Sequence, residues 1–411
     1  MNNMLIAQSG GPTAAINASL SGAIQEAIRS KEIDGIYGAL NGIQGVLAGT
    51  IVDLRAQFAR QEDFSILECT PAMALGSCRF RLPEEDADPA LYEKIDEIFH
   101  HYQIAYFFYI GGNDSMDTVD KLARHFSRTG QNIKVIGIPK TIDNDLPGTD
   151  HSPGFGSSAK FIATAMLEII RDCYVYDTDS VTIVEIMGRH AGWLTAAAAL
   201  PRTVGARAPH LIYLPEVAFD PEQFIQDVKE VQCLTRNCIV AVSEGVRLAN
   251  GSFAAENFQS GVVDAFGHRY LSGVGKYLEA LVREKIGCKV RSIELNVLQR
   301  CSSHLMSATD VREARKIGSY AIRFALQGHT GVMMVLERVS NRPYMVRIGC
   351  KPVSEIANRE QLVPRTWINK RGNDVTDEMF EYLLPLIEGE VPYPTQNGMP
   401  VHFVLDKTIV K

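Results

Sequence analysis

One local pattern recurs along the sequence: a short apolar segment, a loop with glycine or acidic residues, and then an amphipathic helical stretch. Clear copies have their apolar segments at residues 3–8, 104–110, 133–139 and 180–186. Strands that alternate with helices in this way form βαβ units, which assemble into mostly parallel sheets with helices on both faces. Later apolar segments predict further strands at residues 210–215, 238–243, 293–298 and 331–336.

The length of 411 residues allows two or three domains. We expect an α/β protein with two Rossmann-like three-layer α/β/α domains, whose mostly parallel sheets bring several strand ends around one cleft. After about Arg338 the pattern stops, and short strands with proline-rich turns predict a small C-terminal extension.

Composition limits the partners. The formal net charge of -7 argues against a nucleic acid or a membrane surface held by bulk charge. No apolar run reaches the length of a membrane span, and the N-terminus has no signal-peptide pattern. The 8 cysteines are scattered without a C-x-x-C pair, which is typical of reduced thiols. We therefore expect a cytoplasmic protein.

The segment VIGIPKTIDND (135–145) combines a buried-looking strand with a polar loop. The loop carries Lys140, Thr141, Asp143 and Asp145 at the end of the strand, where open α/β sheets bind their ligands. The two aspartates lie two positions apart, so an extended loop would project them to the same side. One carboxylate could then accept a proton while the other holds a metal or orients the first. On this segment alone, a polar turn of no catalytic importance is an equal alternative.

Two loops have paired glycines between a strand and a helix, SGGPTAAIN (9–17) and GGNDS (111–115). Paired glycines let backbone N–H groups approach an anion, and a helix N-terminus adds its dipole, so the loops predict phosphate binding. The alternatives are a tight turn in the first loop and helix capping by Asp114 or Ser115 in the second. Phosphoryl transfer also needs cations, which Lys140, Arg79 and Arg189 could supply.

Three more segments place charged residues near strand ends: MGRHAG (187–192), SEG (243–245) and LQRC (298–301). Glu244 could accept hydrogen bonds from sugar hydroxyls or cap a helix. We expect Arg300 and Arg291 at opposite ends of one strand, and a structural role for His190.

Taken in order, SGG, LGSCRF, GGNDS, PKTIDND, MGR, SEG and LQR closely resemble the phosphofructokinase family over about residues 4–335. Members have two α/β domains with the active site between them, and transfer a phosphoryl group to the 1-hydroxyl of fructose 6-phosphate. The resemblance implies a donor-binding domain (1–155 with about 299–337), a sugar-phosphate-binding domain (156–298) and a C-terminal capping extension (338–411).

The resemblance also assigns site residues. Asp143 resembles the general base, and Gly11 and Arg79 resemble contacts to the phosphoryl donor. Residues around the sugar phosphate are Thr141, Ile142, Met187, Gly188, Arg189, Glu244 and Arg300. Arg291 resembles a residue that reaches into a neighbouring subunit's site, which implies a homodimer or homotetramer.

Asn113 stands where many relatives have a magnesium-associated aspartate. The resemblance implies Mg²⁺ as cofactor, but a neutral amide holds a hard cation less well than a carboxylate does. We therefore expect Mg²⁺ mainly on the phosphoryl donor, near Asp114, Asp143 or Asp145.

Two positions predict the donor. Members that use ATP typically have glycine at the positions of Asp114 and Lys140, whereas the pyrophosphate-dependent branch has Asp and Lys, as here. A carboxylate ~4 Å from an ATP α-phosphate would cost roughly 1 kcal/mol in water and about 4 kcal/mol near a protein surface. We therefore expect Asp114 and Lys140 to act in catalysis with pyrophosphate, and ATP is the nearest alternative donor.

The acceptor is less constrained by the sequence. Val297 and Ser180 replace a histidine and an arginine that help bind the 6-phosphate in bacterial ATP-dependent members. These replacements leave room for sedoheptulose 7-phosphate. Alternatives from other classes are a non-catalytic sugar-phosphate sensor and an NAD or lipid kinase, which would share only the GGNDS-like loop.

Overall fold

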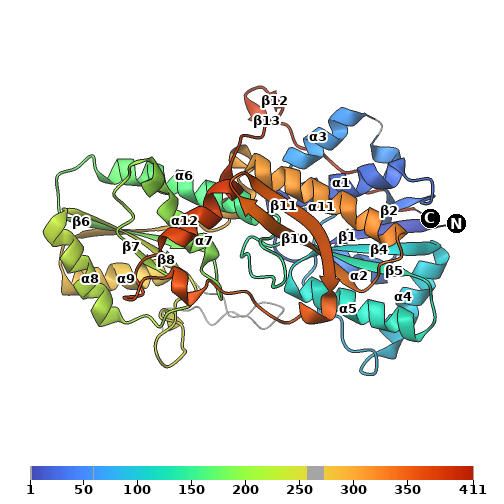
Figure 1. The fold of residues 1–411 in the computed structure, drawn as a ribbon, viewed down its shortest axis with the longest axis horizontal. Coiled ribbons are helices and arrows are strands. Elements are labelled where there is room, and N and C mark those ends of the chain that lie inside the picture. The colour runs from blue at the N-terminus through green and yellow to red at the C-terminus, as the bar shows by residue number, and fades with distance from the viewer. Residues whose placement is uncertain (1, 59, 257–272, 411) are drawn as a thin grey trace.

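The computed structural model describes residues 2–58, 60–256 and 273–410. It contains two separate main β-sheets, each covered by helices, and the chain passes between them more than once (Figure 1). The larger sheet has seven strands in the order β11-β10-β5-β4-β1-β2-β3. They are β1 (Asn3–Gln8), β2 (Ile36–Ala39), β3 (Ile51–Asp53), β4 (Ile104–Gly111), β5 (Lys134–Pro139), β10 (Val332–Asn341) and β11 (Tyr344–Pro352). The inner strands pair in parallel, whereas β3 and β11 are antiparallel edges.

Helices cover both faces of the larger sheet because strand residues alternate between faces. Met4 and Ile6 of β1 pack into a core with α1 (Ile16–Arg29), α3 (Gln61–Cys69) and α11 (Ala308–Leu326). Leu5 and Ala7 pack into the opposite core with α2 (Gly42–Ala48), α4 (Pro89–His101) and α5 (Asn113–Arg128).

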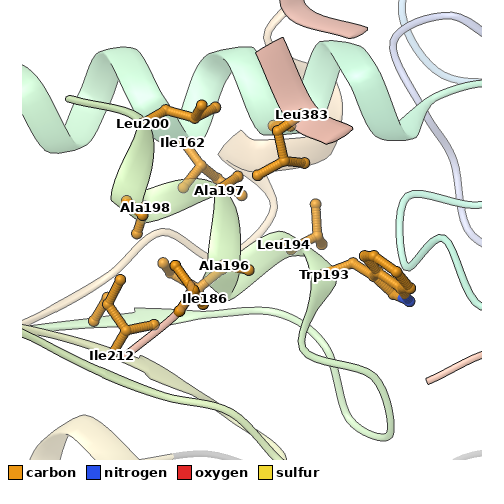
Figure 2. Close-up of a cluster of buried hydrophobic side chains, with 14 of the residues drawn as sticks. Ile162, Ile186, Trp193, Leu194, Ala196, Ala197, Ala198, Leu200, Ile212 and Leu383 are labelled. Carbon is orange, nitrogen blue, oxygen red and sulfur yellow. The ribbon is translucent and has the colours of Figure 1, made fainter. Parts of the chain in front are cut away.

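The smaller sheet is fully parallel, in the order β7-β8-β6-β9. Its strands are β6 (Ser180–Ile186), β7 (Leu211–Tyr213), β8 (Asn237–Ser243) and β9 (Lys289–Glu294). One face packs on α6 (Phe155–Cys173), α7 (Trp193–Ala196) and the 3-10 helix η2 (Ala197–Val204), as Figure 2 shows. The other face packs on α8 (Pro221–Leu234) and α9 (Val274–Lys285). The predicted fold class of two three-layer units with mostly parallel sheets is confirmed.

One predicted strand was wrong. We expected a strand at residues 293–298 that would continue to Arg300, but β9 ends at Glu294 and α10 (Leu298–Cys301) begins four residues later. Asn296 adopts a positive φ of 44°, a left-handed conformation that breaks the extended chain. Arg291 and Arg300 therefore lie on different elements.

The chain after residue 338 contacts both sheets. The strand β10 continues to Asn341, and β11 adds an edge to the larger sheet. α12 (Asp377–Leu383) and the 3-10 helix η7 (Leu384–Ile387) pack into the core of the smaller sheet, where Leu383 faces Ile162 (Figure 2). The remaining short elements are η1 (Arg55–Gln57), η4 (Ser303–Leu305), η5 (Val353–Glu355), η6 (Arg365–Trp367), β12 (Thr395–Gln396) and β13 (Met399–Pro400). The predicted domain boundaries stay predictions.

In the part of the chain that the structure describes, no helix has both the length and the apolar character needed to cross a bilayer.

Candidate active site

Three loops meet at the carboxyl ends of β1, β4 and β5, which are neighbours in the larger sheet. The order reverses between β1 and β4, because β2 lies on one side of β1 while β4 and β5 lie on the other. Ligands bind at such a switch point in open α/β sheets. The loops touch directly, since the Lys140 amide donates to the Gly111 carbonyl at 3.0 Å. The Ser77 hydroxyl, in the loop that carries Arg79, donates to the Gly10 carbonyl at 2.7 Å.

Lys140 is buried at the centre of these loops. Its Nζ donates to the Gly11 carbonyl at 2.6 Å. A Cβ atom on Gly10, which has a φ of +80°, would lie 3.1 Å from this Nζ, and one on Gly11 would lie 3.7 Å from Arg300 Nη1. Gly10 therefore keeps the space in which the Lys140 ammonium lies, whereas a side chain at Gly11 would make only an ordinary contact with Arg300. Burial lowers the pKa of Lys140 to about 8, although the carboxylates of Asp143 and Asp145 oppose this shift.

Asp143 lies among charges from both sheets. Burial, then repulsion by Asp145 and Glu244, raises its pKa to about 7, against the attraction of Lys140 and Arg189. Because Lys140 follows β5, Arg189 follows β6 and Glu244 follows β8, this cluster joins the two sheets. Burial also raises the pKa of the Asp145 carboxyl. A carboxylate with a pKa near the working pH is suited to accept a proton from a substrate hydroxyl.

The loop after β6 is fixed against the loop after β8. The Gly188 amide donates to Glu244 Oε1 at 3.3 Å, and burial raises the pKa of this carboxyl. A Cβ on Gly245 would lie 2.1 Å from the Arg189 carbonyl, so only glycine fits there. Glu244 thus sits at a strand-end turn and accepts from a neighbouring loop, and the helix-capping alternative is wrong.

The α10 turn completes this side. Gln299 Oε1 accepts from the Met187 amide at 3.2 Å, which places Arg300 next to the β6 loop. The Arg300 Nε is buried and has no hydrogen-bond partner among the described residues. A buried donor without a partner is costly, and an anionic ligand would satisfy it.

Other predicted substrate residues differ in their placement. Thr141 forms a bridge with Gly154, and its hydroxyl accepts from the Asp143 amide at 3.1 Å. Ile142 lies in the loop after β5 of the larger sheet, yet its side chain is buried in the core of the smaller sheet. Arg291 lies exposed on the edge strand β9, where it pairs with Asp172 at 3.4 Å and not with the Asp143 cluster.

The GGNDS loop starts α5 without a side-chain cap. The N-cap is Gly112, so helix capping by Asp114 or Ser115 is wrong; Asp114 is exposed in the first turn. The Asn113 amide bonds through both polar atoms: Oδ1 accepts from the Asn358 amide at 2.6 Å, and Nδ2 donates to the Arg359 carbonyl. Its predicted metal role stays a prediction. No cluster of three or more potential His, Cys, Asp or Glu ligands occurs within the described residues.

A segment that the sequence did not single out, residues 358–363, crosses beside this site. The Gln361 amide donates to the Asp145 carbonyl at 2.7 Å, and its carbonyl accepts from Trp193 Nε1 at 2.9 Å. Glu360 pairs with His190 at 2.8 Å, so this histidine has a structural partner. No local pattern could have found the segment, because its side-chain partners are more than 140 residues away in the chain.

The chain matches the family description "Phosphofructokinase" over residues 3–325. It is 40% identical over 402 residues to a protein of Halomonas elongata named pyrophosphate--fructose 6-phosphate 1-phosphotransferase, covering 97% of this chain and 95% of the relative. A relative of the same name from Xanthomonas campestris pv. campestris is 40% identical, covering 99% and 97%. The crystal structure of a pyrophosphate-dependent phosphofructokinase from Nitrosospira multiformis superposes with a TM-score of 0.90 at 38% identity, covering 100% of this chain and 98% of that one. This chain therefore belongs to the phosphofructokinase family.

Proposed function

We propose that this protein transfers a phosphoryl group from pyrophosphate to the 1-hydroxyl of fructose 6-phosphate. The products are fructose 1,6-bisphosphate and phosphate, and the reaction is a reversible step of glycolysis. Near-full-length relatives at 40% identity carry the corresponding name. The observation that carries the proposal is the position of Lys140, buried between two glycine loops with its amine on the Gly11 carbonyl.

The choice of donor follows from charge and space. An ammonium group at the junction of two glycine loops is suited to a compact, highly charged donor such as pyrophosphate. The exposed carboxylate of Asp114 in the first turn of α5 adds negative charge beside the same loops. A longer donor with an α-phosphate near Asp114 would meet repulsion.

In the proposed mechanism Asp143 accepts the proton of the sugar 1-hydroxyl. The oxygen then attacks the distal phosphorus of pyrophosphate in line, a new P–O bond forms, and the bond to the bridging oxygen breaks to release phosphate. Lys140, Arg79 and the glycine N–H groups stabilise the charge on the transferred group. Arg189, Glu244 and Arg300 hold the sugar phosphate, and the unpartnered Arg300 Nε supports an anion at that position.

Mg²⁺ is the proposed cofactor. Burial raises the pKa values of the Asp143 and Asp145 carboxyls, and the charge of Asp145 further raises that of Asp143, so a hard cation beside this pair would be stabilised by both carboxylates. When bound, the metal would neutralise phosphate charge and polarise the transferred group. The Asn113 amide is less suited, because both of its polar atoms already bond to the backbone of residues 358 and 359.

The natural acceptor and the assembly complete the proposal. Val297 is 46% exposed at the start of α10, and the Ser180 hydroxyl donates to Asn237, so neither supplies a cation for the 6-phosphate. Sedoheptulose 7-phosphate is therefore a second acceptor to test. We further propose a cytoplasmic homodimer or homotetramer, in which the exposed Arg291 serves a neighbouring subunit's site.

A coupled assay that detects fructose 1,6-bisphosphate tests the function directly. We expect turnover with fructose 6-phosphate and Mg-pyrophosphate, and a kcat/KM with ATP that is roughly five- to a thousandfold lower, in line with a repulsion of roughly 1–4 kcal/mol at Asp114. Faster turnover with ATP would overturn the donor assignment. Calorimetric binding of fructose 6-phosphate without turnover with either donor would instead support the sensor alternative.

A further inference from the structure

The loop that carries Asp143 is bonded to a tyrosine more than 200 residues away in the sequence. Asn144 Nδ2 donates to the Tyr382 hydroxyl at 2.7 Å, across a separation of 238 residues. The same hydroxyl donates to the Asp150 carbonyl at 2.7 Å. Asn144 Oδ1 accepts from the Ser152 amide at 2.9 Å. The Tyr382 hydroxyl therefore joins the start and the end of the loop that follows β5.

The loop needs such a constraint because of its conformation and charge. Asn144 lies between Asp143 and Asp145 and adopts a positive φ of 56° while almost fully buried. A left-handed residue other than glycine costs about 1 kcal/mol or more and persists only where surrounding contacts fix it. The flanking carboxylates also repel each other, which favours a more open loop. The side-chain bonds of Asn144 oppose both effects.

Tyr382 is itself held rigidly. Its ring packs against Trp193 and Trp367, with centroids 5.1 and 5.5 Å away, and the Arg338 guanidinium lies 4.6 Å above it. Arg338 also donates to the Tyr382 carbonyl at 3.1 Å and to the Asp150 carboxylate at 3.0 Å. The hydroxyl is thus a fixed point to which the loop is attached.

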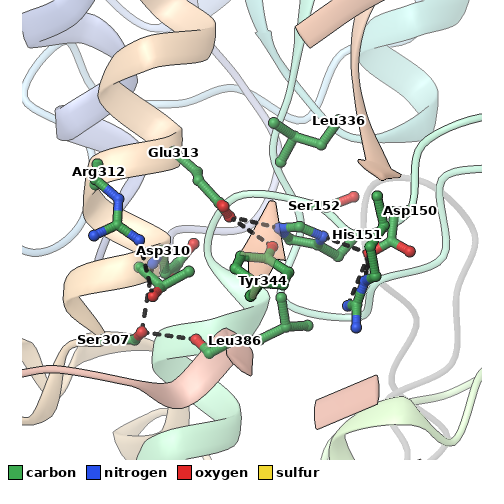
Figure 3. A network of polar contacts seen from close by, with 12 residues as sticks. Asp150, His151, Ser152, Ser307, Asp310, Arg312, Glu313, Leu336, Tyr344 and Leu386 are labelled. Carbon is green, nitrogen blue, oxygen red and sulfur yellow. Dashed lines mark hydrogen bonds and ion pairs between the residues drawn. The ribbon is translucent and has the colours of Figure 1, made fainter. Parts of the chain in front are cut away.

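The end of the loop is anchored in the same way. Figure 3 shows His151 between Asp150 and Glu313, each 2.8 Å from one ring nitrogen. Although burial lowers the pKa of His151, hydrogen bonds to these two carboxylates raise it to about 9, so the ring stays charged at neutral pH. Glu313 belongs to α11, which packs in the larger sheet's core. Asp150 is therefore linked through His151 to the helix layer of the larger sheet, whereas Tyr382 packs in the core of the smaller sheet.

We propose that Tyr382 is a positioning residue for phosphoryl transfer, which acts through Asn144 to hold the carboxylate of Asp143 toward the substrate hydroxyl. This proposal rests on the proposed function, in which Asp143 is the base. Tyr382 lies outside the glycine and aspartate motifs. Its hydroxyl accepts a hydrogen bond from Asn144 and donates one to the Asp150 carbonyl. It orients the base and does not itself contact the reacting atoms.

The test removes one hydroxyl. Since a displacement of about 1 Å can cost on the order of 100-fold in rate, Tyr382→Phe should lower kcat roughly 10- to 100-fold. KM for either substrate should change less than about threefold, because ground-state contacts are kept. The matched control is Tyr102→Phe, whose hydroxyl donates to the Val410 carbonyl at 2.9 Å next to the amino end of β4. This control should keep wild-type kcat. An equal change in KM and kcat, or an unchanged kcat, in Tyr382→Phe would overturn the proposal.

A double-mutant cycle tests whether Tyr382 acts through Asn144. Asn144→Gly keeps access to the positive φ but loses the side-chain bonds. If the two residues act together, the double variant should lose no more kcat than the worse single variant, whereas additive losses would contradict the proposal. Hydrogen exchange in residues 141–152 gives a readout without turnover: it should be faster in Tyr382→Phe than in Tyr102→Phe. Wild-type protein inactive with both pyrophosphate and ATP would refute the function alone, and equal exchange in the two variants would refute the positioning role alone.

Discussion

The loops at the carboxyl edge of the larger sheet and the segment of residues 358–386 contribute to the same site in different ways. The loops contain the charged groups, and short motifs reveal them in the sequence. Residues 358–386 contain no such motif, yet they bond to Asn113, Asn144 and Asp145. The chemical groups are therefore encoded locally, whereas their orientation depends on distant contacts. Variants in the loops should therefore abolish chemistry, and variants in residues 358–386 should weaken it.

The largest effect is expected for the base. Asp143→Asn removes the proton acceptor and should lower kcat roughly 100- to 10,000-fold, the range for loss of general-base catalysis. Binding of fructose 6-phosphate, measured by calorimetry, should change little because the amide keeps the shape of the side chain. Asp86→Asn, an exposed change, is the control. Near-normal turnover in Asp143→Asn would remove Asp143 from this role.

Loss of the buried cation should come next. Lys140→Met should lower kcat with pyrophosphate roughly 100- to 1,000-fold, as expected for loss of a group that stabilises transition-state charge. Lys134→Met, at the opposite end of the same strand β5, should leave kcat unchanged. If both variants are equally active, Lys140 does not contact the transferred group.

The pH dependence of the free energy of unfolding shows whether the charge of Asp143, and not only its shape, affects stability. Its pKa is about 7 in the folded protein and near 3.8 when unfolded, so folding favours the protonated form. This stabilisation is complete below about pH 4 and is lost as pH rises through about 7. Measured by denaturant unfolding between pH 4 and 8, wild type should become progressively less stable relative to Asp143→Asn. A constant difference across this range would show that Asp143 is not buried among like charges.

The smallest effect is expected in residues 358–363. The negative charge of Glu360 contributes to the raised pKa of Asp145, after burial. Glu360→Gln should therefore lower that pKa and shift the NMR titration profile of the Asp145 carboxyl toward lower pH, by a small amount because Glu360 is partly exposed. Glu355→Gln, an exposed change in the same part of the chain, should leave the profile in place. A shift toward higher pH would contradict the sign of this interaction.

The sequence alone determined the α/β class, the positions of most main strands along the chain and the charged residues of the candidate site. Periodic apolar segments report local backbone structure, and ordered motifs such as PKTIDND carry reactive side chains at strand ends. The sequence prediction was wrong near Arg300, because the left-handed conformation of Asn296 ends a strand that the apolar residues of 293–298 had predicted to continue.

Only the tertiary structure decided which charged groups lie close enough to shift one another's pKa values, and which distant residues fix their orientation. The raised pKa of Asp143 depends on charges that follow β5, β6 and β8, and these loops meet only after two sheets have formed. The bonds from Tyr382 and Gln361 to the TIDND loop likewise span more than 200 residues. Such contacts leave no local pattern in the sequence. Each partner fits the preferences of its own helix or turn, and the two become neighbours only when these elements pack together.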